Sequence, residues 1–184
     1  MKTALVLIDI QNDYFPGGRM ELVGSLEASL RAQEVLAAFR NNGGDIAHIQ
    51  HLSTRPNATF FLPNTPGAEI HTNVAPLAGE TVLVKNFPNS FRGTGLHETL
   101  SARQFERIVF AGMMTHMCID TTVRAGFDLG YKCVLIGDGC ATKDLTFRGR
   151  TIPANDVNAA YFSALDGMFA EVKSSKEFLA EPSN

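Results

Sequence analysis

Apolar residues of this chain gather in short continuous runs, which polar segments rich in glycine and proline separate. Continuous apolar runs of this length are typical of strands in a parallel sheet that is covered on both faces. The pattern therefore predicts buried strands. We expect strands over residues 3–10, 46–52, 81–85, 107–112 and 132–137, and a sixth, edge strand around Val172.

Between these runs, apolar residues recur at intervals of three and four, which is typical of helices with one buried face. We expect a helix that Ser25 caps and Gly43 ends, helices over residues 95–103 and 118–129, and a last helix that begins near Pro153. One face of the last helix is predicted to pack against the core, namely Val157, Ala160, Tyr161, Ala164, Leu165 and Met168.

The alternation of strands and helices predicts an α/β fold, a three-layer α/β/α sandwich around a six-stranded, mainly parallel sheet. A chain of 184 residues suits one hydrophobic core, so we expect a single domain over residues 1–184. The segment 53–79 contains four prolines and little periodicity. Such a long irregular connection is typical of a lid or a binding loop.

The composition narrows the classes of partner. The net charge of −3 is spread along the chain without a basic block, which argues against nucleic acid. No apolar run approaches the roughly 18 residues of a membrane span, and the chain begins with a strand pattern instead of a signal peptide. Its three cysteines match neither a disulfide framework nor a C-x-x-C metal pattern. We therefore expect a cytoplasmic protein that acts on a small molecule.

Cys118 is the first candidate for chemistry. It follows the apolar run 107–112 after a short turn and stands at the predicted start of a helix. The unpaired N–H groups and the positive dipole at a helix start favour thiolate over thiol. The position therefore predicts a nucleophile, whereas Cys133 and Cys140 are interpreted as small core residues.

Asp9 and Lys85 stand at the carboxyl ends of two predicted strands, where parallel sheets bind their ligands. Taken singly, Asp9 equally suits a turn and Lys85 a solvated strand end. Three reactive side chains at one edge of the sheet, with Cys118 as the third, are a stronger signal. In the strand order 3-2-1-4-5-6 the strands of Asp9 and Lys85 lie two spacings apart, roughly 10 Å, which a lysine side chain or a bent strand end must bridge.

The histidines are weaker candidates for a partner of the thiol. His116 lies two positions before Cys118, and residues at that spacing do not face each other on a helix. The same argument excludes Asp120. Only His51 ends a strand on the reactive side of the sheet, so we expect it in the substrate pocket.

Taken together, four motifs resemble the isochorismatase-like cysteine hydrolase superfamily, which includes nicotinamidases and N-carbamoylsarcosine amidases. The order and spacing of these motifs are more specific than any one of them, and they cover nearly the whole chain. They are Leu5–Tyr14 (LVLIDIQNDY), Val84-Lys85 with Ser90-Phe91 and Gly93-Thr94, Ala111-Gly112 through Cys118 with Thr122 and Ala125, and Gly137–Thr142 (GDGCAT).

By this resemblance Asp9, Lys85 and Cys118 form a catalytic triad. The resemblance also implies a cis peptide bond between Met113 and Met114, and an oxyanion hole formed by the backbone N–H groups of Met114 and Cys118. It implies hydrolysis of a C–N bond in a small amide or carbamoyl compound through a covalent thioester. Asp9 is then the proton acceptor and donor.

Two departures from the superfamily refine this expectation. Metal-binding nicotinamidases carry Asp-x-His at the end of the second strand, where this chain reads His51-Leu52-Ser53, so we expect neither a catalytic metal nor a cofactor. Members that cleave the vinyl ether of isochorismate can lack the cysteine, so Cys118 favours C–N hydrolysis. Vinyl-ether hydrolysis with Asp9 as proton donor, and a catalytically silent small-molecule-binding protein, are the alternatives.

Aromatic residues near the predicted strand ends are candidates for the pocket wall. The expected pocket residues are Phe15, His51, Phe61, Phe87, Phe91 and Met117, with Phe60 and Leu62 from the long loop. Exposed aromatic loops also serve subunit contacts. We therefore expect a homo-oligomer, a dimer or a tetramer, and the resemblance points the same way.

Overall fold

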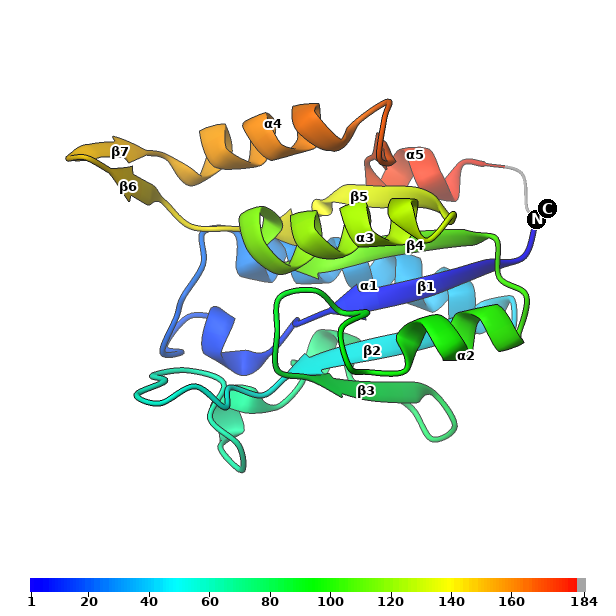
Figure 1. The fold of residues 1–184 in the computed structure, drawn as a ribbon, viewed down its shortest axis with the longest axis horizontal. Coiled ribbons are helices and arrows are strands. Elements are labelled where there is room, and N and C mark those ends of the chain that lie inside the picture. Colours follow the sequence, from blue (N-terminus) through cyan, green and yellow to red (C-terminus); the bar gives the residue numbers. More distant parts are fainter. Residues whose placement is uncertain (182–184) are drawn as a thin grey trace.

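A computed structural model describes residues 1–181 of the chain. Six parallel strands form one sheet in the order β3-β2-β1-β4-β5-β8 (Figure 1), so the expected order 3-2-1-4-5-6 is confirmed. The strands are β1 Thr3–Ile8, β2 Asp45–His51, β3 Thr81–Lys85, β4 Arg107–Met113, β5 Lys132–Ala141 and β8 Glu171–Lys173.

Helices cover both faces of the sheet (Figure 1), which confirms the three-layer α/β/α class. One face carries α1 (Ser25–Asn41) and the short α5 (Ser175–Leu179). The other face carries α2 (Leu96–Ala102), α3 (Asp120–Asp128) and α4 (Ala154–Leu165).

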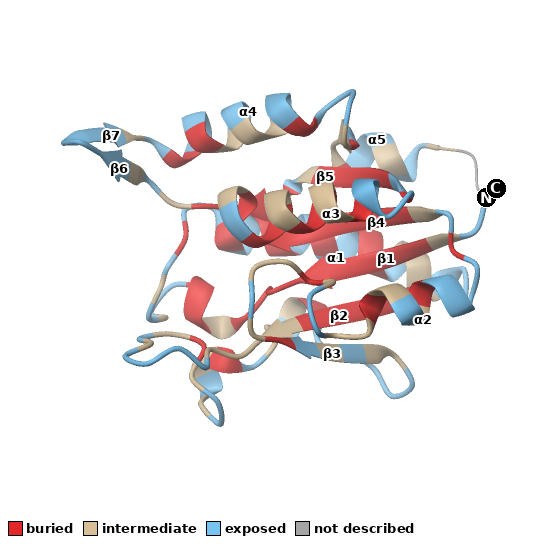
Figure 2. Ribbon diagram, in the orientation of Figure 1, coloured by how far each residue is buried: buried red, intermediate tan, exposed pale blue. Residues whose placement is uncertain are grey.

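The side chains of β1 explain its continuous apolar pattern. Leu5 and Leu7 pack into the apolar cluster on the α1 face, whereas Val6 and Ile8 pack into the cluster on the α2 and α3 face. All four are at most 2% exposed, and Figure 2 shows the same burial along the central strands. A strand that is buried on both faces requires an apolar residue at every position.

The region after β5 differs from the expectation. β5 continues to Ala141 instead of ending at Gly137. Beyond it, β6 (Leu145–Phe147) and β7 (Arg150–Ile152) pair as an antiparallel hairpin that the apolar pattern does not predict. The hairpin projects from the body of the molecule beside α4 (Figure 1).

The predicted buried face of α4 is wrong in part. Val157 and Leu165 are buried as expected, but Ala160 and Ala164 are exposed, and Met168 lies beyond the end of α4 and is 66% exposed. α4 packs near β8, the three-residue strand at the edge of the sheet, so only a narrow line of its side chains reaches the core.

The long connection between β2 and β3 contains two short 3-10 helices, η2 (Pro66–Ala68) and η3 (Thr72–Val74). It is tied to the loop after β1, because the backbone N–H of Asn12 donates to Glu69 at 3.0 Å and that of His71 donates to Ile10 at 2.8 Å. The connection therefore forms a fixed wall beside the carboxyl end of β1. Throughout residues 1–181, no helix is long and apolar enough to cross a membrane.

Candidate active site

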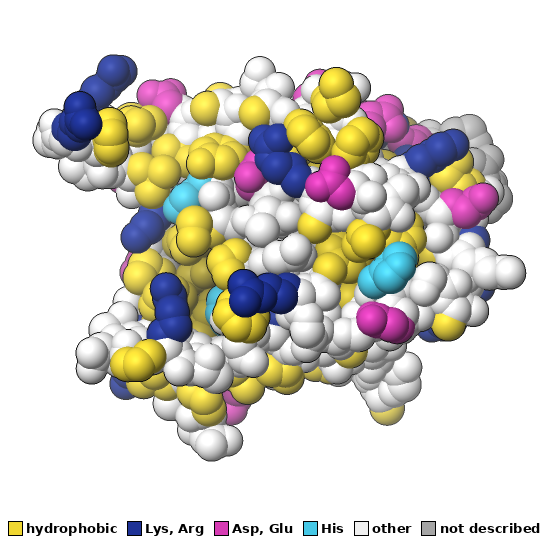
Figure 3. All heavy atoms as spheres, viewed as in Figure 1, with side chains coloured by type: hydrophobic (Ala, Val, Ile, Leu, Met, Phe, Trp, Pro, Cys, Tyr) yellow, Lys and Arg dark blue, Asp and Glu magenta, His cyan; other side chains and the backbone are white. Residues whose placement is uncertain are grey.

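Four reactive side chains meet at the carboxyl edge of the sheet, as expected for a parallel α/β fold. Asp9 follows β1, His51 ends β2, Lys85 ends β3, and Cys118 lies in η4 (Thr115–Ile119), which follows β4. Figure 3 shows that the surface is hollowed at this edge, with hydrophobic side chains in the hollow and Lys and Arg side chains on both sides of it.

The backbone at Asp9 brings its carboxylate to the same face of the sheet as Lys85. Ile8 packs on the α2 and α3 face, so regular alternation would send the next side chain to the α1 face. Asp9 instead has a φ of 53°, in the left-handed region that costs a residue with a Cβ roughly 1–3 kcal/mol. This local break in the strand lets Asp9 meet Lys85, which is the register partner of His51.

Asp9 and Lys85 form a buried ion pair, with Nζ 2.8 Å from Oδ2. Burial by itself would raise the pKa of Asp9, but the charge of Lys85 and the interaction with His51 outweigh it, so the pKa of Asp9 lies below its ordinary value. Burial by itself would lower the pKa of Lys85, but the charge of Asp9 outweighs that, so the pKa of Lys85 is raised. The resting pair is therefore carboxylate and ammonium, and the lysine side chain bridges the two strand spacings.

Neighbouring polar groups fix the lysine but leave the carboxylate incompletely bound. Lys85 Nζ also donates to the carbonyl of Pro88 at 2.8 Å. The Pro88 carbonyl belongs to a turn held by Thr122, whose Oγ1 accepts from the backbone N–H of Ser90 at 3.0 Å. Apart from the ion pair, neither carboxylate oxygen of Asp9 accepts a hydrogen bond of normal geometry from residues 1–181. A buried carboxylate with free lone pairs is available to a substrate or a proton.

Cys118 is 3% exposed and lies in one π-helical turn before α3, not at the first position of a regular helix. Burial raises the pKa of its thiol, the charge of Asp9 raises it further, and the charge of Lys85 lowers it without reversing the result. The expectation that the position alone favours thiolate is therefore wrong for the resting site. The thiol proton must pass to a base when sulfur attacks a substrate.

His51 is closer to the thiol than its predicted role in the pocket wall required. Its Nδ1 lies 4.0 Å from Sγ of Cys118 and 3.6 Å from Oδ2 of Asp9. The ring packs on Phe61 at a centroid distance of 5.7 Å. The sequence analysis placed His51 at the correct edge but had no signal for its distance to a cysteine 67 positions away.

Gln11 and Asp13 are supporting residues behind the site. The side chain of Gln11, which is fully buried, accepts from the backbone N–H of His51 at 2.7 Å and donates to the carbonyl of His51 at 2.9 Å. Asp13 accepts from the backbone N–H of Phe61 at 2.6 Å. The sequence pattern assigned both to a loop, and these contacts to distant segments leave no local signal.

Two of the expected pocket residues lie next to the reactive cluster, and two contact side chains outside it. Phe61 is fully buried beside His51, and Met117 is adjacent to Cys118 and 41% exposed. Phe15 stacks on His71 at 3.6 Å, and Phe87 is 42% exposed with the Arg92 guanidinium over its ring.

Phe91 packs against the apolar cluster that contains Cys118. Its ring stacks on Tyr131 at 6.1 Å and lies beside Gly126 of α3. It therefore packs within the α2 and α3 layer, and its role in the pocket wall stays a prediction.

The turn between β4 and Cys118 has two unusual backbone features. The peptide bond between Met113 and Met114 is cis. Gly112 has a φ of 141°, and a Cβ at this position would collide with the carbonyl oxygen of Ile8. Glycine is thus required where β4 approaches β1 beneath the site.

His116 and the other cysteines lie outside the cluster. His116 Nδ1 is 2.6 Å from Oγ1 of Thr142, so its ring is directed to another partner. Cys140 is buried and donates to the carbonyl of Ile136 at 3.3 Å. Cys133 donates to the carbonyl of Tyr131 at 3.6 Å.

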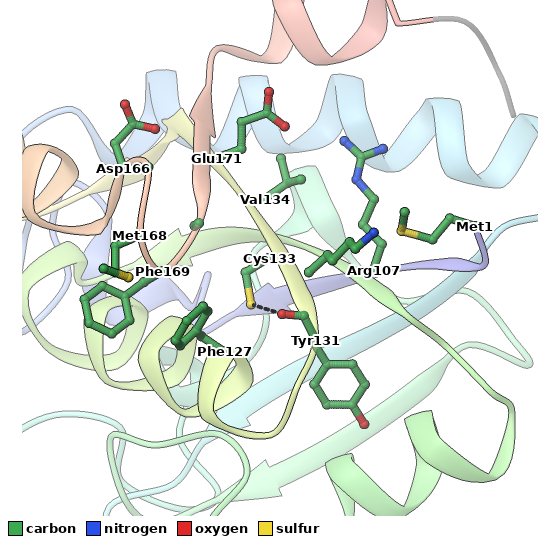
Figure 4. A pocket seen from close by; sticks show the side chains of 13 residues that line it. Met1, Arg107, Phe127, Tyr131, Cys133, Val134, Asp166, Met168, Phe169 and Glu171 are labelled. Atoms are coloured by element: carbon green, nitrogen blue, oxygen red, sulfur yellow. Dashed lines mark hydrogen bonds between the residues drawn. The ribbon is translucent and has the colours of Figure 1, made fainter.

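A separate groove of about 500 Å³ lies at the opposite edge of the sheet, around the first residues of β4 and β5 (Figure 4). The groove is lined by Cys133, Phe127 and Met168, among others. The Arg107 guanidinium also lines it and forms an ion pair with Glu181 at 2.9 Å. Among residues 1–181, the groove holds no cluster of reactive groups comparable with the one at the carboxyl edge, so we place the candidate site at Cys118.

The donor atoms of Asp9, His51 and Cys118 lie within 4.8 Å of one another, a spacing that a metal ion requires. The Lys85 ammonium, however, already lies 2.8 Å from the carboxylate. A divalent cation bound by Asp9 would meet this charge at short range, and the electrostatic repulsion opposes its binding. The cluster therefore suits proton transfer better than metal coordination.

Comparison with known proteins gives a consistent family. The family profile described as the isochorismatase domain matches residues 3–176. The isochorismatase family protein YddQ of Bacillus subtilis is 46% identical over 179 residues, 97% of this chain and 99% of that protein. The crystal structure of an isochorismatase hydrolase from Oleispira antarctica has a TM-score of 0.94 at 46% identity, and the match covers 98% of this chain and 97% of that chain.

A more distant relative carries a named activity. A ureidoacrylate amidohydrolase of Variovorax paradoxus is 27% identical over 176 residues, which cover 78% of this chain and 69% of that protein.

Proposed function

The chain belongs to the isochorismatase family of hydrolases, and from that premise we propose that it hydrolyses a C–N bond of a small amide or carbamoyl compound through a thioester on Cys118. The observation that carries the proposal is the buried thiol beside the Asp9–Lys85 ion pair at the carboxyl edge of the sheet. The ureidoacrylate amidohydrolase among its relatives supports the same bond type.

In this mechanism Cys118 attacks the substrate carbonyl as its proton leaves to a base of the cluster; Asp9 is the base that the family resemblance implies. The N–H groups of Met114 and Cys118 stabilise the oxyanion, and Lys85 offsets the negative charge that develops on sulfur. The C–N bond breaks as the leaving nitrogen takes up the proton. The base then deprotonates a water that attacks the thioester, and the proton returns to sulfur as the acid leaves.

Vinyl-ether hydrolysis of an isochorismate-like acid, with Asp9 as proton donor, is the alternative reaction. The buried carboxylate suits it, but a thiol beside the carboxylate is then without a task. Alkylation of Cys118 separates the two reactions, because it abolishes C–N hydrolysis and largely spares ether cleavage.

Further features stay predictions: a single domain over residues 1–184, a cytoplasmic location, a homo-oligomer, and a reaction that needs no metal or cofactor. Exposed apolar side chains such as Met168 and Phe147 are consistent with a subunit contact. Light scattering at micromolar concentration tests the assembly.

The decisive experiment is ammonia release from a panel of small amides, ureides and carbamoyl amino acids, with intact-mass detection of the acyl-enzyme. We expect Cys118→Ala to lose turnover by several orders of magnitude and to form no adduct. Cys133→Ala, which removes a thiol at the opposite edge of the sheet, is the matched control and keeps both. Full activity of Cys118→Ala on a substrate that the parent hydrolyses ends the proposal.

A further inference from the structure

His51 is a reactive group that the mechanism above does not use. A single ring nitrogen, Nδ1, faces both the thiol of Cys118 at 4.0 Å and the carboxylate of Asp9 at 3.6 Å. The ring is only partly exposed at 14%, so it remains accessible to a molecule that enters the hollow. Its alternation along β2 places it on the same face as Ile49, which packs into the α2 and α3 cluster that contains Cys118.

The Asp9 carboxylate is a weak base for the thiol proton. Its pKa lies below the ordinary value because of Lys85 and His51, whereas the pKa of the thiol lies above its own. Proton transfer from Cys118 to Asp9 is therefore unfavourable, because the donor holds its proton more tightly and the acceptor binds a proton more weakly than usual. An imidazole is ordinarily half-protonated near pH 6.5, which makes it the better matched acceptor at neutral pH.

We propose that His51 is a further catalytic residue, whose Nδ1 takes the proton of the Cys118 thiol while Asp9 stabilises the imidazolium that forms. The inference deepens the proposed function, on which it rests for the later steps. It requires the neutral tautomer with hydrogen on Nε2, which leaves the lone pair of Nδ1 directed to sulfur. A separation of 4.0 Å is at the long end for a sulfur hydrogen bond, and such contacts tighten when substrate binds.

The protons balance over the cycle. The S–H bond breaks, an Nδ1–H bond forms, and sulfur bonds to the carbonyl carbon. The imidazolium gives this proton to the leaving nitrogen as the C–N bond breaks. Neutral His51 then takes a proton from the attacking water and returns it to sulfur when the thioester breaks. Asp9 and Lys85 stay ionised throughout, in agreement with their short contact.

The surroundings hold the imidazole in this orientation. Gln11 binds both backbone polar groups of His51, and the Phe61 ring packs on one side. The titratable groups that face the imidazole are Asp9, Lys85 through its pair with Asp9, and Cys118. Two more touch Phe61 and not the imidazole: the phenol ring of Tyr14 lies 4.6 Å away, and the carboxylate of Asp13 accepts its backbone N–H.

The test is the rate at which iodoacetamide alkylates Cys118, followed by peptide mass mapping as a function of pH. It needs no substrate, so its outcome is independent of the C–N bond assignment. For the parent we expect alkylation that is already rapid at pH 7, because His51 receives the thiol proton as sulfur attacks the reagent. For His51→Gln, which cannot accept a proton, we expect at least a tenfold lower rate at pH 7 and a rise that begins only in the alkaline range.

His116→Gln is the matched control, since its ring is directed to Thr142 instead of the thiol, and it keeps the parent profile. A His51→Gln protein with the parent profile overturns the inference and leaves Asp9 as the base. If that variant fails to fold, the parent decides alone, because a parent profile that rises only in the alkaline range, as expected for a buried thiol without a base, also overturns the inference. Normal His51-dependent alkylation without turnover on any amide sinks the C–N assignment but not the role of His51.

Discussion

The two ends of strand β3 carry two clusters built from the same kinds of group. Glu80 stands just before the strand and pairs with Arg40 and His48. Lys85 ends the strand and pairs with Asp9, which His51 faces. Each cluster combines a carboxylate, a cation and an imidazole from β2, so composition alone does not separate them.

The difference lies in how completely each carboxylate is bound. Glu80 accepts from Arg40 at 2.7 and 2.8 Å, from His48 at 2.8 Å and from the backbone N–H of Leu77 at 2.8 Å. Asp9 is fully buried, meets Lys85 through one oxygen, and accepts no well-directed hydrogen bond from the described residues 1–181.

A carboxylate that accepts four hydrogen bonds, as Glu80 does, stabilises the fold by linking separate segments and has little capacity left for a ligand. A buried carboxylate with few hydrogen-bond donors can bind a proton or a substrate, but its incomplete hydrogen bonding lowers the stability of the fold. The comparison therefore assigns the Glu80 cluster to stability and the Asp9 cluster to chemistry.

The largest expected effect separates the clusters by activity. Asp9→Asn is expected to lower kcat/KM by about 10⁴-fold, roughly 5 kcal/mol, because it removes the charge that supports proton transfer beside Cys118. Glu80→Gln is the matched change in the other cluster and should leave kcat/KM within about threefold. Both are measured on the best substrate of the amide panel, with circular dichroism to verify folding. An equal loss in both variants would dissolve the distinction.

The next effect concerns stability at the Asp9 end. Lys85→Met leaves the Asp9 charge buried without its partner, and breaking a buried pair in this way costs about 3–5 kcal/mol. The double variant Asp9→Asn with Lys85→Met removes both charges, so most of the lost stability should return while activity stays absent. Urea unfolding measures the free energy of unfolding of the parent, Lys85→Met and the double variant. A double variant as unstable as Lys85→Met would mean that the ion pair is not the source of the cost.

Much of the fold could be predicted because it follows local patterns. The runs around Val6 and Val109 are apolar at every position, since both faces of the central strands are covered. The hairpin after β5 was missed because its turn is Arg148-Gly149, with φ values of 49° and 80°. Positive φ at both positions suits a two-residue hairpin turn, but Asn-Gly or Asp-Gly is the usual sequence signal for it.

The site was predictable only as far as strand ends reveal it. Asp9, Lys85 and Cys118 could be named because all three follow apolar runs at one edge of the sheet. The left-handed backbone at Asp9 and the binding of Gln11 to His51 could not be predicted from the sequence, because both depend on segments that meet only in the folded chain. The raised pKa of the Cys118 thiol could not be predicted either, because it follows from burial and not from the position of the residue in the sequence.

The smallest expected effects on stability come from the Glu80 cluster. Glu80→Gln removes charge-assisted hydrogen bonds from Arg40 and should cost about 1–3 kcal/mol of unfolding free energy at pH 7, measured by urea unfolding. A loss below about 0.5 kcal/mol would show that saturation of this carboxylate does not stabilise the fold.

The same carboxylate predicts an acid-range dependence. The hydrogen bonds from Arg40, with smaller help from Leu77 and His48 and against the effect of burial, lower the pKa of Glu80 from 4.5 to about 2. A carboxyl group with a lower pKa in the folded state stabilises the fold above its unfolded pKa, and this contribution is lost as the pH falls through the folded pKa. Part of the stability should therefore disappear between pH 4.5 and 2. Carboxyl-detected NMR should show a glutamate that titrates near pH 2 and is missing from Glu80→Gln; if every glutamate titrated near 4.5, Glu80 would not be held by its donors in solution.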